Sequence, residues 1–223
     1  MKKTASISLF SKDVAPETLA IAFISIIYLV GIVGLSIAPA SFLVRLSPAN
    51  LLLSIGLVLY FHRNWSRSTI LAFAAIYLFT WTAEWLGVST GLIFGSYQYG
   101  GVLGPKIQGT PLMIGINWLL LSYCTASFLT LIRLTRNRLF NTLLGAFILT
   151  GIDVLIEPVA MALDFWQWDL GEVPLQNYIG WFAVALPVMA IHFFAGTAEN
   201  NKVALAVYIL QILFFSVLTA TIV

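Results

Sequence analysis

The stretch LFNTLLGAFILTGIDVLIEPVAMA, residues 139–162, is long and apolar enough to cross a membrane as a helix, yet it contains two carboxylates, Asp153 and Glu157. A third acid, Glu84, interrupts a similar stretch at residues 68–88. Neither stretch contains a Lys or Arg that would neutralise these acids. An ionisable group at membrane depth costs roughly 2.5 to 3.5 kcal/mol and usually marks a functional site. We therefore interpret the three carboxylates as acid/base groups.

The rest of the chain has the same membrane character. Hydrophobic residues make up 60% of the 223 residues and charged residues only 9%. Long runs without charge predict an all-α polytopic membrane protein with about seven transmembrane helices and no soluble domain, so that residues 1–223 form a single membrane domain. The predicted spans are residues 18–38, 43–61, 68–88, 111–132, 139–162, 179–197 and 203–222.

Basic residues predict the orientation of these spans. Nine Lys and Arg residues fall on the side of the N-terminus and two, Arg45 and Lys106, on the other. This bias predicts a cytoplasmic N-terminus and an outside C-terminus for a multi-pass protein of the cytoplasmic (inner) membrane. The nine are Lys2, Lys3, Lys12, Arg63, Arg67, Arg133, Arg136, Arg138 and Lys202.

With this orientation, the three acids reach a similar depth in the outer half of the membrane. Asp153 and Glu157 are four residues apart and share a helix face, and Pro158 loosens the helix beside them. Asn117, in the outer half of the fourth span, is expected to complete the polar cluster. An alternative is that these groups only form interhelical hydrogen bonds that hold the bundle together.

Two outer loops next to the acids look like copies of each other. Fourteen positions separate Glu84 from the Gln of Tyr97-Gln98-Tyr99, and fourteen separate Asp153 from the Gln of Trp166-Gln167-Trp168. Each copy then reaches a Trp seven residues after a Pro, at Trp118 and at Trp181. We therefore expect parallel repeat units at about residues 68–132 and 139–197, with Glu84 facing Asp153 across a pseudo-twofold axis. The paired positions Trp118 and Trp181, and likewise Tyr99 and Trp168, should lie on opposite sides of one cavity.

Aromatic side chains crowd these loops, where they either line a site for an apolar, conjugated ligand or form an ordinary interfacial belt. The candidate ligand-lining residues are Tyr97, Tyr99, Trp118, Trp166, Trp168 and Trp181. The two histidines, His62 and His192, form no HxxxH box, and the glycines do not match GxGxxG. We therefore expect neither a metal nor a redox cofactor, and the chain has no polybasic feature typical of nucleic-acid binding.

Buried acids surrounded by aromatic rings suit the protonation of a carbon–carbon double bond. A buried carboxylic acid beside a carboxylate can stay protonated at neutral pH and can protonate a carbon–carbon double bond. The partner carboxylate can stabilise the resulting cation and accept a proton from water or from an adjacent carbon. The first outcome is hydration, and the second is isomerisation or cyclisation.

A set of ordered motifs extends from about residue 80 to residue 185. The motifs are Glu84-Trp85-Leu86-Gly87, Phe94-Gly95-Ser96-Tyr97-Gln98-Tyr99, Gly109-Thr110-Pro111, Asn117-Trp118, Asp153 to Pro158, Trp166-Gln167-Trp168 and Asn177-Tyr178-Ile179-Gly180-Trp181. In these motifs the chain resembles a known family, the integral-membrane carotenoid biosynthesis proteins that act as carotenoid 1,2-hydratases. Members of that family often have Asp before the proline, where this chain has Glu157.

The resemblance implies hydration of the terminal ψ-end double bond of an acyclic or monocyclic carotenoid, which gives a tertiary 1-hydroxyl. The polyene would enter sideways from membrane lipid. One of the three acids would protonate C-2 while another, with Asn117, activates the water that captures C-1. Two alternatives are a membrane lycopene cyclase, in which an internal double bond traps the cation, and a proton-coupled transporter.

Overall fold

The computed structural model describes residues 7–9, 12–39 and 42–223, so Lys2 and Lys3 lie outside the described residues. Within them, seven helices are long and apolar enough to cross a membrane, which confirms the predicted all-α polytopic fold. The helices are α1 (Pro16–Ile37), α2 (Ser47–Tyr60, extended at its start by the 3₁₀ helix η1, Phe42–Leu46), α3 (Arg67–Thr90), α4 (Leu112–Ile132), α5 (Arg138–Ala162), α6 (Leu175–Phe194) and α7 (Lys202–Ile222).

The helix termini follow from local side-chain chemistry. Asn137 caps α5, since its side-chain oxygen accepts from the backbone N–H groups of Leu139 and Phe140. Asn201 caps α7 in the same way. α6 begins at Leu175, directly after Pro174, which is four residues earlier than the predicted start at residue 179. This extra turn matters because it contains Asn177, a residue of the candidate site.

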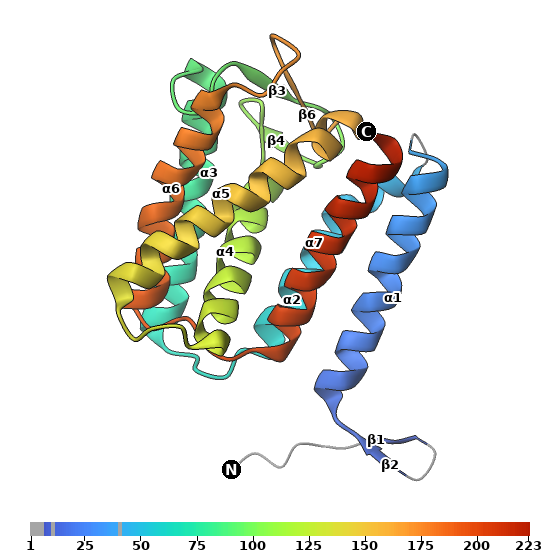
Figure 1. Cartoon of the computed structure of the whole chain (residues 1–223), viewed down its shortest axis with the longest axis vertical. Coiled ribbons are helices and arrows are strands. Elements are labelled where there is room, and N and C mark those ends of the chain that lie inside the picture. The colour runs from blue at the N-terminus through green and yellow to red at the C-terminus, as the bar shows by residue number, and fades with distance from the viewer. Residues whose placement is uncertain (1–6, 10–11, 40–41) are drawn as a thin grey trace.

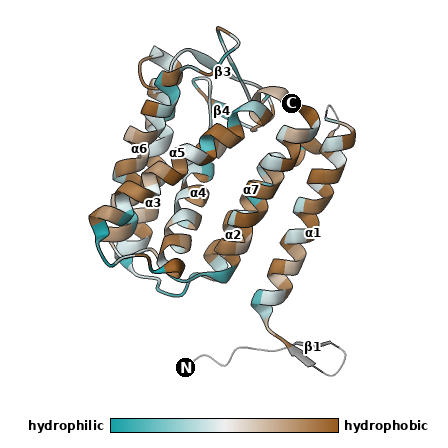
Figure 2. Cartoon of the chain, viewed as in Figure 1, coloured by the Kyte–Doolittle hydropathy of each residue, from teal (hydrophilic) through white to brown (hydrophobic). Residues whose placement is uncertain are grey.

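Helix α4 is the centre of the bundle. It packs against α2, α3, α5, α6 and α7, and 72% of its span is buried, compared with 17% of the α1 span. α1 lies at the edge beside α7 (Figure 1). Figure 2 shows hydrophobic residues along the helices, while hydrophilic residues gather mainly at loops and helix ends. An apolar exterior of this kind is typical of helices that face lipid.

Short strands cover the end of the bundle where the chain ends (Figure 1). β3 (Tyr97–Tyr99) pairs antiparallel with β6 (Trp166–Trp168), and Gln98 lies opposite Gln167. β4 (Lys106–Ile107) pairs with β5 (Thr110–Pro111), and β1 (Ile7–Leu9) pairs with β2 (Lys12–Val14) near the N-terminus. The β3–β6 register places Tyr97 opposite Trp168 and Tyr99 opposite Trp166.

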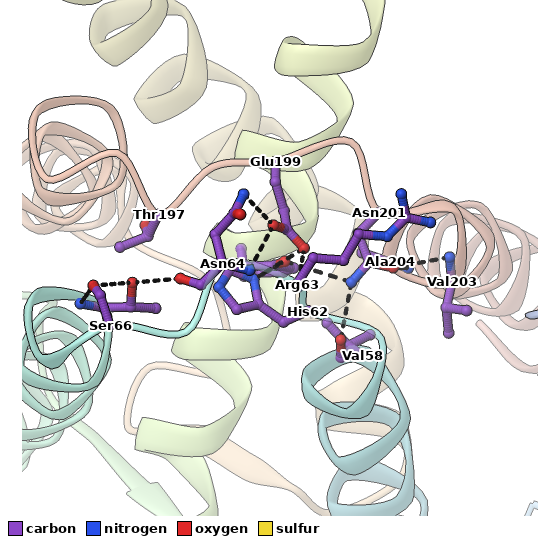
Figure 3. Close-up of polar contacts among 12 residues, drawn as sticks. Val58, His62, Arg63, Asn64, Ser66, Thr197, Glu199, Asn201, Val203 and Ala204 are labelled. Carbon is purple, nitrogen blue, oxygen red and sulfur yellow. Dashed lines mark hydrogen bonds and ion pairs between the residues drawn. The ribbon is translucent and has the colours of Figure 1, made fainter. Parts of the chain in front are cut away.

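A polar cluster, which the sequence did not reveal, joins two loops at the end of the bundle opposite the β3–β6 strands, with His62 and Tyr123 buried and Arg63 and Asn64 exposed (Figure 3). The Glu199 carboxylate accepts hydrogen bonds from the backbone N–H groups of Arg63 and Asn64 and from the Asn64 side chain. His62 Nδ1 lies 3.2 Å from Glu199 Oε1 and 2.7 Å from the Tyr123 hydroxyl. The cluster therefore fixes the α2–α3 and α6–α7 loops to the central helix α4.

Candidate active site

Two of the three predicted acids and five of the six predicted aromatic residues line a small cavity beneath the β3–β6 strands, whereas Asp153 and Trp118 do not line it. Its volume is about 10 Å³, roughly the space that one water molecule needs. The lining residues are Glu84, Phe94, Tyr97, Tyr99, Ile114, Glu157, Trp166, Trp168, Asn177 and Trp181. Two acids from different helices, α3 and α5, thus face one space walled by aromatic rings.

Glu84 is held by donors from two elements. Its Oε2 accepts from the hydroxyls of Tyr97 and Tyr99, and its Oε1 accepts from Trp118 Nε1 at 2.9 Å. Burial and the neighbouring Glu84 carboxylate raise the pKa of the Tyr97 phenol well above its ordinary value, so Tyr97 keeps its proton and remains a donor. Three donors to one carboxylate stabilise its ionised form.

Glu157 has an equivalent environment in the second half of the chain. Its Oε2 accepts from Trp166 Nε1 at 2.8 Å and from Trp168 Nε1 at 2.9 Å. Its Oε1 accepts from the Asn177 side chain at 3.1 Å. The strand β3 therefore supplies two donors to Glu84, and its partner β6 supplies two donors to Glu157.

Asp153 lies one helical turn before Glu157 and is fully buried. Its Oδ2 accepts from Asn177 Nδ2 at 2.6 Å, so the same amide nitrogen contacts both acids of α5. Among the residues that the structure describes, its Oδ1 has no hydrogen-bond partner. Buried polar atoms in proteins are normally paired, so this free oxygen is the atom of the site that remains available to another group.

The structure changes two expectations about which acids and rings face each other. By its hydrogen bonds, the counterpart of Glu84 is Glu157 and not Asp153, because Glu157 lies one turn closer to β6. Trp118 and Trp181 do not lie across a cavity, because their rings stack directly with centroids 4.0 Å apart. Tyr99 and Trp168 do line one cavity, and the repeat boundaries themselves stay a prediction.

Asn117 does not join the acids. It lines a separate pocket between α1, α2, α4 and α7. Asn177 of α6 takes the expected role, as it donates to both Asp153 and Glu157. The sequence analysis missed it because the predicted sixth span began at residue 179, which placed Asn177 outside the helix. Its position four residues before Trp181, on the same helix face, was the available signal.

Within the described residues, seven helices apolar enough to span a membrane and a buried group of carboxylates between them define the chain as an integral-membrane protein. The chain belongs to the carotenoid biosynthesis protein family, whose model matches residues 47–223. It is 30% identical over 125 residues to the bisanhydrobacterioruberin hydratase of Haloarcula japonica, which covers 52% of this chain and 41% of that relative. The match thus spans less than half the length of the relative. No solved structure matches the chain.

Proposed function

We propose that this protein is a carotenoid 1,2-hydratase, which adds water across the terminal ψ-end double bond of an acyclic or monocyclic carotenoid. The observation that carries the proposal is the Asp153–Asn177–Glu157 arrangement beside a buried cavity with room for about one water. The family membership and the name of the hydratase relative support the same chemistry.

The hydrogen bonds suggest a role for each acid. Asp153 receives a single donor and has one unpartnered oxygen, so we assign to it the protonated form, which gives its proton to C-2. A tertiary cation then forms at C-1. Glu157 receives three donors, which favour the carboxylate, and its negative charge lies where it can stabilise this cation.

Water completes the reaction. A water molecule in the cavity attacks C-1, and its oxygen forms the new carbon–oxygen bond while Glu157 accepts the released proton. Transfer of this proton from Glu157 to Asp153 restores the starting state, so one water is consumed and no other reactant is needed. Glu84 acts beside them as a second fixed carboxylate, and the rings of Trp168, Trp181 and Tyr97 provide apolar walls with negative faces toward the cation.

Product analysis tests the proposal and separates it from its alternatives. Expression in cells that make lycopene or γ-carotene should yield pigments heavier by one water, with the oxygen derived from labelled water under anaerobic conditions. A product with unchanged mass and a new ring would identify a cyclase. No change of pigment in either host, with the protein present in the membrane, would leave transport as the better hypothesis.

A further inference from the structure

A second pocket shares a wall with the acid cavity. Its volume is about 60 Å³, compared with about 10 Å³ for the acid cavity. Ile114 and Trp166 line both spaces, and the Trp166 indole that borders the second pocket also donates to Glu157. Of these two spaces, the second pocket is the larger.

The second pocket contains polar side chains that the reaction does not use. We call three of them the amide cluster, namely Tyr28 of α1, Asn50 of α2 and Gln211 of α7, and the side chains of Ser47 and Asn117 also line the pocket. The Tyr28 hydroxyl lies beside the two amide side chains and 3.3 Å from the Ser54 hydroxyl. Most of the other lining residues are apolar. A polar group inside a membrane span needs a partner or a function.

Two atoms of the amide cluster lack such a partner within residues 7–9, 12–39 and 42–223. Gln211 is only 4% exposed, and its Oε1 has no hydrogen bond. Asn50 Oδ1 is also buried and unpaired. Buried polar atoms are rarely left in this state, because removal from water without a new hydrogen bond is unfavourable. The amide cluster is therefore prepared for a ligand group that forms hydrogen bonds.

We propose that the amide cluster binds the hydroxyl group of a hydroxylated carotenoid end group, the group that hydration forms. A hydroxyl donates to an amide oxygen and accepts from a phenol or an amide nitrogen, so it satisfies the cluster, whereas a hydrocarbon end group cannot. Since Ile114 and Trp166 border both spaces, the product end group needs to move only past these two side chains. The choice of a carotenoid as the ligand rests on the proposed function, whereas the presence of a site for a hydrogen-bonding group does not.

Binding measurements on the whole protein in lipid nanodiscs test the assignment. The two probes are 1-hydroxy-1,2-dihydrolycopene and lycopene, and quenching of tryptophan fluorescence reports binding beside Trp166. The protein carries Glu157→Gln, so that neither probe is converted. We expect the hydroxylated probe to bind about tenfold more tightly, as one or two good hydrogen bonds provide. Equal affinity for the two probes would show that the cluster only holds water and would overturn the assignment.

Variants locate the preference in the amide cluster. Gln211→Met and Asn50→Leu should each weaken binding of the hydroxylated probe and leave lycopene binding unchanged. Met113→Leu changes the same pocket without removing a polar group, so it should keep the preference. A preference that survives both polar substitutions would place the hydroxyl elsewhere. If cells form hydroxylated pigment but the protein shows no preference for the hydroxylated probe, the assignment of the amide cluster is refuted and the proposed function is not. If no hydroxylated pigment forms, the proposed function is refuted.

Discussion

Asn177 Nδ2 lies 2.6 Å from Asp153 Oδ2 and holds this acid beside Glu157, which the same nitrogen contacts at 3.1 Å. One amide on α6 thereby bridges two acids on α5. Because the third acid, Glu84, is held separately by Tyr97, Tyr99 and Trp118, the site consists of a linked pair and a single acid. Substitutions can therefore test the linked pair and the single acid independently.

Removal of either member of the pair should abolish hydration while the protein stays folded. Asp153→Asn and Glu157→Gln keep the side-chain volume but cannot exchange a proton, and general acid or base groups contribute typically about 10² to 10⁴-fold. The ratio of hydroxylated to parent pigment in carotenoid-producing cells measures the loss. The exposed acids Asp169 and Glu172 provide matched controls, since Asp169→Asn and Glu172→Gln should be fully active. Full activity of the two pair variants would refute the proposed acid catalysis.

Loss of the shared amide should slow the reaction without removing an acid. Asn177→Leu leaves Asp153 without its only donor and removes one of three donors from Glu157. Hydrogen bonds to charged groups contribute about 1.5 to 3 kcal/mol, so we expect about a tenfold to hundredfold lower rate. The neighbouring amide is the control, because Gln176 donates to the carbonyls of Gly91 and Leu92 at the surface. Equal rates for Asn177→Leu and Gln176→Leu would show that the amide does not position the acids.

The tyrosine donors to Glu84 should contribute mainly to stability. Tyr97→Phe or Tyr99→Phe leaves a buried carboxylate with one donor fewer, which should lower the free energy of unfolding by about 1.5 to 3 kcal/mol. Thermal unfolding in detergent measures this change. Tyr60→Phe is the control, since that ring is 78% exposed. A midpoint temperature equal to that of the control would contradict the donor role.

The same contact predicts a pH dependence of stability. Burial raises the pKa of Tyr97 in the folded protein. The contribution of Tyr97 to the free energy of unfolding is therefore complete below the ordinary phenol pKa of about 10, and it decreases only as the pH rises above that value. The destabilisation caused by Tyr97→Phe should therefore be constant between neutral pH and about pH 9. A loss that varies within this range would show that another group controls the contact.

Reporter fusions test the membrane orientation. A reporter after Val223 should behave as extracytoplasmic, and one in the loop between α4 and α5 as cytoplasmic, because the topology predicted from the sequence assigns nine basic residues to one side and two to the other. Activity of an enzyme reporter that works only outside the cell measures the first fusion. The reverse pattern would move the acid site to the inner half of the membrane.

The sequence predicted the helices well because each span must be apolar over its whole length, a property of contiguous residues. It also predicted that Glu84, Asp153 and Glu157 matter, since acids in such spans are rare. It placed Asn117 in the site and missed Asn177, because nothing in the sequence marks one of these polar residues over the other. Whether Asn177 lies in the sixth helix depended on one helical turn at the start of α6. The cluster around Glu199 was missed because its partners come from two distant loops and α4.

By itself, the sequence therefore determined the seven spans and the three buried acids, because hydrophobicity and charge act on contiguous residues. Only the tertiary structure decided which groups meet: Glu84 with Tyr97, Tyr99 and Trp118, and Asp153 with Asn177. The tertiary structure also pairs β3 with β6, so that Trp168 lies opposite Tyr97. Both Trp166 and Trp168 donate hydrogen bonds to Glu157. These contacts join different helices and strands, and hydrogen bonds depend on distances of a few ångströms that helix packing and the β3–β6 pairing set.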